Sequence, residues 1–262
     1  MATTSTPSLI RALSAALLLF SWLSASGCRA VSGSRSATEV CVLGMTHSGH
    51  ETSELWGLPQ VEAALRALEP DAVLAEIPPD RFGTAAREFA DNGSIEEPRV
   101  KRFPEYTGVL FPLQAELGFE IVPCAAWTEP MARDRSEKLR LWRSERAEDS
   151  ARVEAGQASI RTRLADLGTT DDPHLIHTDA YDTIVKEGLL PYDELFNDDL
   201  GPGGWTNINA AHWALIEAAI DARPGQRLII TFGGWHKYWF LEQLRERDDV
   251  RLLDARDYLP SN

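Results

Sequence analysis

Short apolar runs alternate along this chain with segments of helical periodicity, and this alternation limits what the chain can fold into. The clearest runs are 40–43, 72–75 and 228–232. Each run is too short for a buried helix, and nearly continuous apolar character is typical of strands that are covered on both faces. Strands that alternate with helices indicate β-α-β units around a mostly parallel sheet. The predicted fold class is therefore α/β, with helices flanking the sheet.

The strongest helical pattern lies between two prolines. Segment 61–68 has apolar residues at positions i, i+3, i+4 and i+7, the spacing of one helical face. A second helix is predicted over 81–90, with Asp80 as its N-cap. The other predicted elements are a further helix followed by a strand at 121–122, a helix over 207–222, a helix through 247 and a short strand near 252.

The middle of the chain is highly charged. Of residues 131–166, nine are basic and seven are acidic, and apolar residues recur among them at roughly heptad spacing. This pattern predicts a long solvated helix, or a pair of helices packed along one narrow seam. A basic arm for partners is the alternative, but the mixed signs favour a solvated face. We expect a helical insertion at about 131–200 within a single domain spanning 39–262.

The formal net charge is −14, from 26 Lys and Arg against 40 Asp and Glu. Binding to a phosphate backbone needs a basic surface, so the composition argues against a nucleic-acid partner. Three cysteines are too few for a disulfide-based fold. Cys41 and Cys124 lie in apolar segments that resemble strands, where two buried thiols and one disulfide are both compatible with the sequence.

The N-terminus has the features of an export signal. Arg11 precedes an apolar stretch of about a dozen residues, shorter than the roughly 20 that span a bilayer. Residues 25–28 resemble a bacterial lipoprotein signal, with Ala25 where leucine is usual. We predict a signal peptide at 1–27, lipidation of Cys28, a flexible tether at 28–38 and attachment to the membrane of the bacterial cell envelope. Cleavage with release and an uncleaved anchor are the alternatives, and both also place the domain outside the cytoplasm.

Three polar residues stand where predicted strands end. His47 follows the first strand in the motif Gly-Met-Thr-His, Glu76 ends the second strand, and His236 follows the late strand in Gly-Gly-Trp-His. Carboxyl ends of parallel strands share one edge of a sheet, where ligands bind. The glycine three residues before each histidine lets the backbone turn sharply and approach a ligand closely. We therefore expect His47, Glu76 and His236 to form one site.

This combination of side chains is compatible with two kinds of chemistry. Two imidazoles and a carboxylate can hold a divalent metal such as Zn, Mn or Co, with one position left for water. They can also act without a metal, as a general base and the group that orients it, with Arg81 stabilising an oxyanion. The spacing of the residues does not distinguish these alternatives.

The residues around these motifs resemble the TraB/GumN/Tiki superfamily, which includes erythromycin esterase and ChaN-like proteins. In that superfamily a strand ends in Gly-x-x-His, a later Pro-Asp-x-apolar strand ends in Glu, and an Arg follows five positions on. Here Pro70 and Asp71 lead to Glu76, Arg81 follows, and a second Gly-x-x-His ends at His236. The resemblance covers 41–82 and 205–244, and it implies an erythromycin esterase/ChaN-like α/β fold.

The same resemblance indicates further candidate residues. Trp205 and Asn209 are similar to a Trp-x-x-Arg-Asn signature of some members, with Ile208 in place of the arginine. The neighbourhood of Glu51 is similar to a histidine-glycine-glutamate motif of erythromycin esterases. The members differ in function: Tiki proteins are membrane-anchored metal-dependent proteases, erythromycin esterases are usually described as using histidine without metal, and ChaN is a haem-binding lipoprotein.

Other histidines and polar residues are less specific candidates. His174 and His177 repeat a His-x-x-His spacing, and we expect exposed helix positions there rather than a lid that contributes to the site. His212 lies near the apolar face of its helix and is predicted to be a hydrogen-bonded core histidine. The possible substrate contacts are His50, Glu51, Asn209 and Trp235.

Together these features predict an extracytoplasmic, lipid-anchored hydrolase of peptide, ester or amide bonds. His47, Glu76 and His236 would hold a divalent metal and its water, and Arg81 would stabilise developing charge. The alternatives are a haem- or metal-binding lipoprotein without turnover, a metal-free histidine esterase, and a purely structural lipoprotein. The expected partners are a small-molecule or peptide substrate and the membrane, with no nucleic acid.

Overall fold

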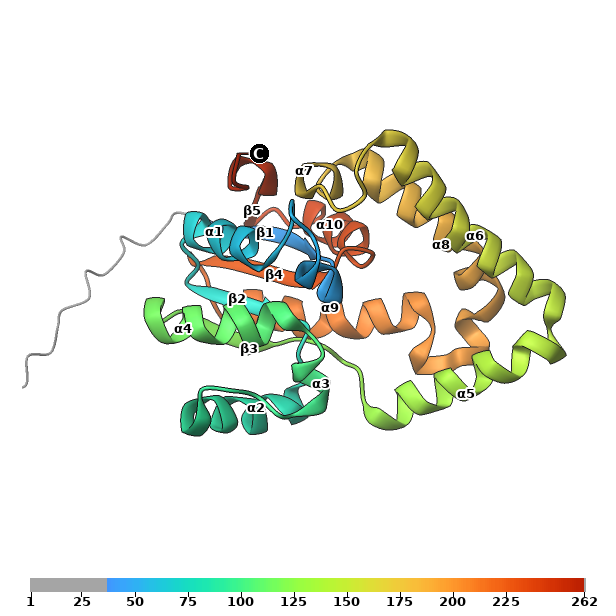
Figure 1. Cartoon of the computed structure of the whole chain (residues 1–262), viewed down its shortest axis with the longest axis horizontal. Helices are drawn as coiled ribbons and strands as arrows, with labels where there is room; N and C mark the ends of the chain where they lie inside the picture. Colours follow the sequence, from blue (N-terminus) through green and yellow to red (C-terminus); the bar gives the residue numbers. More distant parts are fainter. Residues whose placement is uncertain (1–36, 262) are drawn as a thin grey trace, which may run out of the picture. The chain divides into compact units, whose positions relative to one another are not determined.

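The computed structural model describes residues 37–261, and these contain a five-stranded parallel sheet with helices on both faces (Figure 1). This confirms the α/β fold class. The strand order is β3-β2-β4-β1-β5, so β4 lies between β1 and β2. The strands are β1 (Thr38–Met45), β2 (Ala72–Ala75), β3 (Glu120–Pro123), β4 (Arg227–Gly233) and β5 (Val250–Leu253).

The helices around the sheet follow the predicted pattern closely, apart from shifts of a few residues at their ends. The helix predicted over 81–90 begins earlier, at Pro79, because two prolines set the backbone direction there. Asp80 lies inside its first turn, so the prediction that Asp80 caps this helix was wrong. These helices are α1 (Leu58–Leu68), α2 (Pro79–Asn92), α3 (Pro98–Lys101), α4 (Phe111–Leu117), α9 (Trp205–Asp221) and α10 (Lys237–Arg245).

Side chains of each strand alternate between two hydrophobic layers, as the pleat of a sheet requires. In β1, Cys41 and Leu43 face the layer that contains α1 and α4, whereas Val40 and Val42 face the layer that contains α9 and α10. Both faces of the central strands are therefore buried, which explains their continuous apolar sequences. Cys41 and Cys124 belong to opposite layers, and both are free buried thiols, so the disulfide alternative was wrong.

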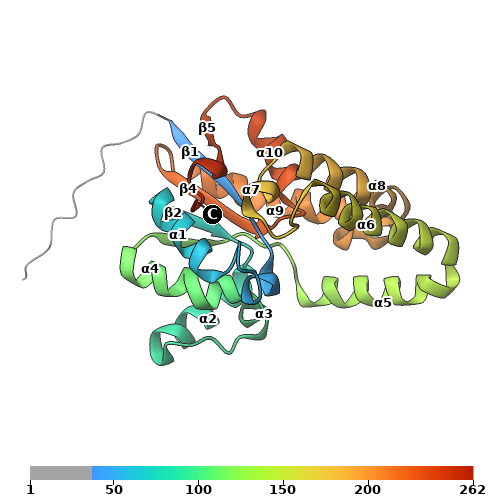
Figure 2. The same cartoon turned by 45° about the horizontal axis from the view of Figure 1, so that its top comes forward.

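The charged middle of the chain forms a helical arm beyond the carboxyl ends of β1 and β4 (Figures 1 and 2). Its helices pack around a small apolar cluster that includes Val153, Tyr192 and Phe196. The segment 131–166 is helical and largely exposed, as predicted, but its apolar seam is completed by α8, which supplies Tyr192 and Phe196. The arm consists of α5 (Glu129–Glu145), α6 (Ala147–Leu167), α7 (Pro173–Ile176) and α8 (Asp179–Leu200).

Two glycines allow α6 and α8 to cross closely. A Cβ at Gly188 would overlap Ile160 Cγ1 and lie 2.9 Å from the carbonyl oxygen of Gly156. We expect Gly188→Ala to lower the free energy of unfolding by about 1–3 kcal/mol, because the two helices must separate. Gly83→Ala in α2 is the matched control, since its Cβ would meet only Arg87 Nη1 at 3.7 Å. Equal thermal unfolding temperatures for the two variants would contradict this packing role.

The N-terminal predictions fall mainly outside the structure. The signal peptide at 1–27, the lipidation of Cys28 and most of the tether at 28–38 lie outside the described residues. Thr38 already belongs to β1, is buried and accepts a hydrogen bond from the Gly225 N–H, so the ordered domain starts no later than this residue. None of the helices within 37–261 combines the length and hydropathy of a membrane span.

Candidate functional site

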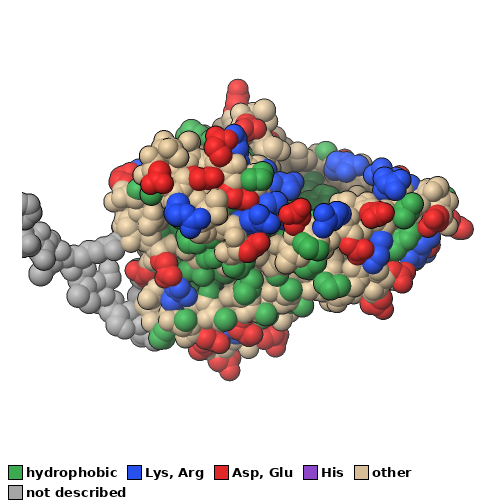
Figure 3. All heavy atoms as spheres, turned by 90° about the horizontal axis from the view of Figure 1, so that it is seen from below, with side chains coloured by type: hydrophobic (Ala, Val, Ile, Leu, Met, Phe, Trp, Pro, Cys, Tyr) green, Lys and Arg blue, Asp and Glu red, His purple; other side chains and the backbone are tan. Residues whose placement is uncertain are grey.

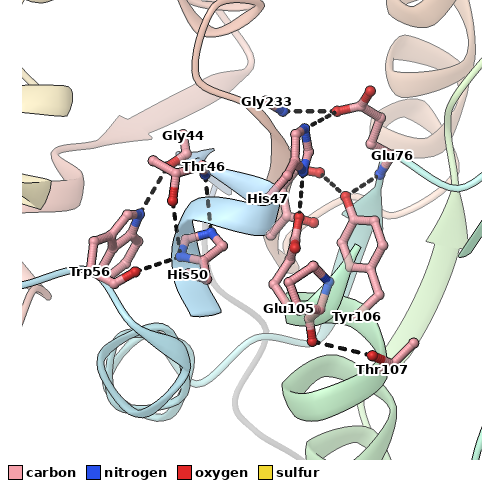
Figure 4. Close-up of polar contacts among 12 residues, drawn as sticks. Gly44, Thr46, His47, His50, Trp56, Glu76, Glu105, Tyr106, Thr107 and Gly233 are labelled. Carbon is pink, nitrogen blue, oxygen red and sulfur yellow. Dashed lines mark hydrogen bonds and ion pairs between the residues drawn. The ribbon is translucent and has the colours of Figure 1, made fainter. Parts of the chain in front are cut away.

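The strand order brings His47 and Glu76 together at the edge of β4. His47 Nε2 lies 3.5 Å from Glu76 Oε2, and the same oxygen accepts a 2.8 Å hydrogen bond from the N–H of Gly233, the last residue of β4 (Figure 4). Glu76 is only 7 % exposed. A buried carboxylate needs such partners, because an isolated charge is strongly disfavoured away from water.

The backbone at His47 has an unusual conformation that aims its ring across the strand ends. Its φ is 52°, one of only two positive values at non-glycine positions in the described part of the chain. The neighbouring strand makes room, since a Cβ at Gly233 would lie 2.8 Å from His47 Nε2. Positive φ costs energy for a residue with a side chain and is concentrated at functional sites. This explains why glycine stands at the end of β4.

Glu105 is the site residue that the sequence interpretation missed. Its Oε1 lies 2.6 Å from His47 Nδ1, and its side chain is almost completely buried (Figure 4). Its other oxygen, Oε2, has no hydrogen-bond partner among residues 37–261. The sequence contained one feature that could have identified it, because Glu105 is the sole charged residue in segment 103–115. His47 is therefore held between two buried carboxylates.

The next residue, Tyr106, fixes this arrangement to the sheet. Its hydroxyl donates to the Thr231 carbonyl oxygen at 2.7 Å and accepts from the Glu76 N–H at 2.8 Å. Tyr106 begins the π-helical segment η2 (Tyr106–Leu110). Such segments are frequent at functional sites because they re-aim side chains within a helix. The single wide turn places Glu105 under His47 and Tyr106 between β2 and β4.

The two carboxylates make His47 a cation. Burial lowers the pKa of its ring, but the hydrogen bonds to Glu105 and Glu76 outweigh this and raise the pKa from 6.5 to about 10. Burial likewise disfavours ionised Glu76, yet its contact with His47 dominates and lowers the pKa of Glu76 from 4.5 to about 2. At neutral pH the ring is therefore an imidazolium with N–H groups on both sides.

His236, in contrast to His47, is an uncharged ring. Asn209 Nδ2 donates to the Trp205 carbonyl oxygen at 2.8 Å, so its Oδ1 is the acceptor that faces His236 Nδ1 at 2.6 Å. The ring of Trp205 stacks on His236 with centroids 4.7 Å apart. Burial lowers the pKa of His236 and outweighs the opposing charge of Glu76. His236 is thus a neutral ring with its proton on Nδ1 and a free lone pair on Nε2.

A cavity of about 690 Å³ opens between these strand ends and the helical arm, within the usual size range of ligand pockets. Its walls include both histidines of the site. The lining residues are Met45, Thr46 and His47 after β1, Gly233, Gly234, Trp235 and His236 after β4, Ile160, Arg161 and Leu164 of α6, Thr170, and Tyr181 of α8.

Not every predicted site residue reaches this cavity. Arg81 is engaged on the surface by Asp80 and Glu129, at 3.1 and 3.4 Å. Glu51 is exposed and does not line the cavity. Trp235 does line it, whereas Asn209 contacts His236 and therefore orients a site residue. The basic side chain at the cavity is Arg161, which comes from the insertion.

His50 has a structural role in the loop after β1. The Thr46 N–H donates to His50 Nε2 at 3.0 Å, so the ring proton is on Nδ1 and donates to the Trp56 carbonyl oxygen at 2.6 Å (Figure 4). Both ring nitrogens are thus occupied, and the side chain is buried. His50 holds the loop that carries His47, and it does not face the cavity.

Two other histidines join separate parts of the fold. The prediction that His177 is exposed was wrong, because its side chain is buried. Its Nε2 accepts a hydrogen bond from the Gly44 N–H at 2.9 Å, which attaches the arm to the end of β1. Burial lowers the pKa of His177 to about 3. His212 is a core residue, as predicted, and its Nδ1 accepts from the Ala126 N–H. Its Nε2 has no partner within the described chain, so it is only half satisfied.

The donor set fits a divalent metal only in part. Two ligands on one tetrahedral zinc, with bonds of about 2.0–2.1 Å, lie about 3.3 Å apart. The 3.5 Å between His47 Nε2 and Glu76 Oε2 is similar. Within residues 37–261, however, no group of three His, Cys, Asp or Glu side chains is gathered closely enough to hold a metal ion. The metal hypothesis remains a prediction.

The charge on His47 leads to a pH prediction. The raised pKa means that His47 contributes stability fully below about pH 6.5, and this contribution is lost as the pH rises through about 10. The lowered pKa means that Glu76 contributes fully above about 4.5 and loses its contribution as the pH falls through about 2. We expect the difference in unfolding temperature between the wild type and His47→Gln to be largest near pH 5–6 and to shrink towards pH 10. A constant difference across this range, with His174→Gln as control, would show that His47 is not an ion-pair partner.

Comparisons of the chain with protein-family models, with curated proteins and with solved structures find no match.

Proposed function

We propose that this protein is a hydrolase of ester or amide bonds in which His236 is the general base and His47 stabilises the oxyanion. The observation that carries the proposal is the pair of histidines at neighbouring strand ends whose pKa values are displaced in opposite directions. Pairs of titratable groups with divergent environments are typical of acid and base partners in catalysis. Both rings line one cavity.

The proposed reaction moves one proton from water to His236 Nε2 and then to the leaving group. His236 Nε2 takes a proton from water, and the resulting hydroxide oxygen attacks the substrate carbonyl carbon. The carbonyl oxygen gains negative charge, which the His47 imidazolium stabilises by its charge and by its Nε2–H, since Nδ1–H is held by Glu105 at 2.6 Å and Nε2 lies 3.5 Å from Glu76. The bond to the leaving group then breaks, and His236 returns its proton to the leaving oxygen or nitrogen. Glu105 and Glu76 keep His47 positive, and Asn209 keeps His236 in the tautomer with a free Nε2.

A divalent metal remains the other route to the same reaction class. His47, Glu76 and His236 would hold it, and it would supply Lewis-acid activation of a bound water. The resemblance to the TraB/GumN/Tiki superfamily supports hydrolysis by either route, since its members include proteases and esterases. We also propose export and attachment through Cys28, which mass spectrometry of the mature N-terminus would test.

The test is hydrolysis by the purified mature protein of p-nitrophenyl butyrate and of an acylated peptide nitroanilide. We expect turnover in excess EDTA. Turnover that requires added Zn, Mn or Co would support a hydrolase but contradict His236 as the base. No turnover under any of these conditions would contradict the proposal. A Soret band in the purified protein would instead support the haem-binding alternative.

A further inference from the structure

We propose that the substrate carries an anionic group next to an apolar segment, and that Arg161 of the insertion recognises the anion. This inference rests on the proposed function because it concerns the same cavity. It names a residue that lies far from the histidine motifs in sequence and outside both segments that carry the family resemblance.

The face of α6 that lines the cavity carries both a cationic side chain and apolar side chains. Ile160, Arg161 and Leu164 line the cavity together, and Ile160 and Leu164 are buried. Trp235 and Tyr181 add aromatic surface to the same lining. A ligand in this space would contact a largely apolar wall and one guanidinium, which suits an amphiphilic molecule better than a fully polar one.

The charge of the cavity wall differs from that of the chain. The protein has 14 more acidic than basic residues. Yet none of the described residues that line the cavity is Asp or Glu, whereas Arg161 lines it. The lining therefore repels anions less than the rest of the surface does, and its guanidinium attracts them.

Arg161 is also available for a ligand. Its neighbour Arg163 pairs with Glu187 at 2.7 Å. For Arg161, no ion pair or hydrogen bond of the guanidinium is found with any residue in 37–261. The side chain is exposed at the cavity. Seen from below, the surface has a hollow with hydrophobic side chains inside and Lys and Arg side chains, interspersed with Asp and Glu, around it (Figure 3).

An arginine in this position recognises a carboxylate or phosphate by charge-assisted hydrogen bonds. We commit to a carboxylate on an acyl chain as the probe, because the wall beside Arg161 is apolar. Octanoate and the neutral octanamide share chain length and shape and differ in charge. Calorimetric titration of the full mature protein with each probe measures this recognition without requiring turnover.

We expect octanoate to bind the wild type roughly tenfold more tightly than octanamide, the difference that one hydrogen bond to a charged group supplies. Arg161→Gln should remove this preference and leave octanamide binding unchanged. Arg161→Lys should retain part of it. Arg163→Gln is the matched control on the same helix, and it should bind both probes as the wild type does.

Several outcomes would overturn the inference: equal binding of the two probes, binding of neither, or an unchanged preference in Arg161→Gln. Turnover is measured separately with p-nitrophenyl butyrate and its carboxylate-tipped counterpart, the p-nitrophenyl monoester of glutarate. A preference for octanoate without turnover of either ester would contradict the hydrolase and leave the anion site standing. Turnover of both esters with no effect of Arg161→Gln on their kcat/KM ratio would contradict the anion site alone.

Discussion

Replacing His236 with Gln is expected to lower kcat/KM for ester hydrolysis by roughly 10²–10⁴-fold, the usual contribution of a general base. Gln keeps a polar group of similar size beside Asn209 but has no basic nitrogen. The fold should persist, because the closest polar contact of the ring is the one to Asn209, beside which Gln also has a polar group. Initial rates and circular dichroism of the purified variant test both statements.

Two further variants separate catalysis from positioning. Asn209→Ala removes the acceptor that holds the His236 Nδ1 proton, so we expect a smaller loss of kcat and a changed acid limb of the pH–rate profile. His174→Gln, which lies outside the cavity lining, should keep the wild-type rate. Activity of His236→Gln within twofold of the wild type would exclude His236 as the base.

The largest effect on stability is expected from the buried ion pair between α8 and α10. Lys237 Nζ contacts both carboxylate oxygens of Asp182 at 2.5 Å, and the lysine side chain is 2 % exposed. Asp182→Ala would leave this ammonium buried without a counter-charge. We expect a loss of about 3–5 kcal/mol in the free energy of unfolding, measured by urea denaturation.

The chain offers a matched control for this prediction. Lys186 and Glu242 form a second ion pair between the same two helices, at 2.6 Å, but both side chains are more than 40 % exposed. Glu242→Ala should therefore cost less than about 1 kcal/mol. The double variant Asp182→Leu/Lys237→Met should recover much of the stability that Asp182→Ala loses, since no unpaired charge remains. Similar losses for Asp182→Ala and Glu242→Ala would show that burial does not set the strength of these pairs.

The sequence by itself determined which segments become strands and which become helices. The runs at 72–75 and 228–232 are strands because their residues are apolar on both sides of the pleat, and α1 forms where apolar residues repeat with helical spacing. Periodicity also predicted the helical insertion. These are local properties, and residues within a few positions of each other are enough to specify them.

Local pattern also placed polar residues at the correct edge of the sheet. Parallel strands share their carboxyl edge, so His47, Glu76 and His236 had to follow strand ends at the same side. Neither Gly44 nor Gly233 has the positive φ that a glycine-dependent turn would use, and at Gly233 the structure gives another reason for glycine, because a side chain would collide with the His47 ring. The sequence pattern did not show which of these ends are neighbours.

Only the tertiary structure decided that β4 lies between β1 and β2, which brings the ends of the three strands together. It also decided that Glu105 supports His47, that Arg81 turns to surface carboxylates, and that Arg161 lines the cavity. The physical reason is that these contacts join residues far apart in the chain. Their free energies depend on burial and charge in the assembled fold, and no local periodicity or motif spacing encodes them.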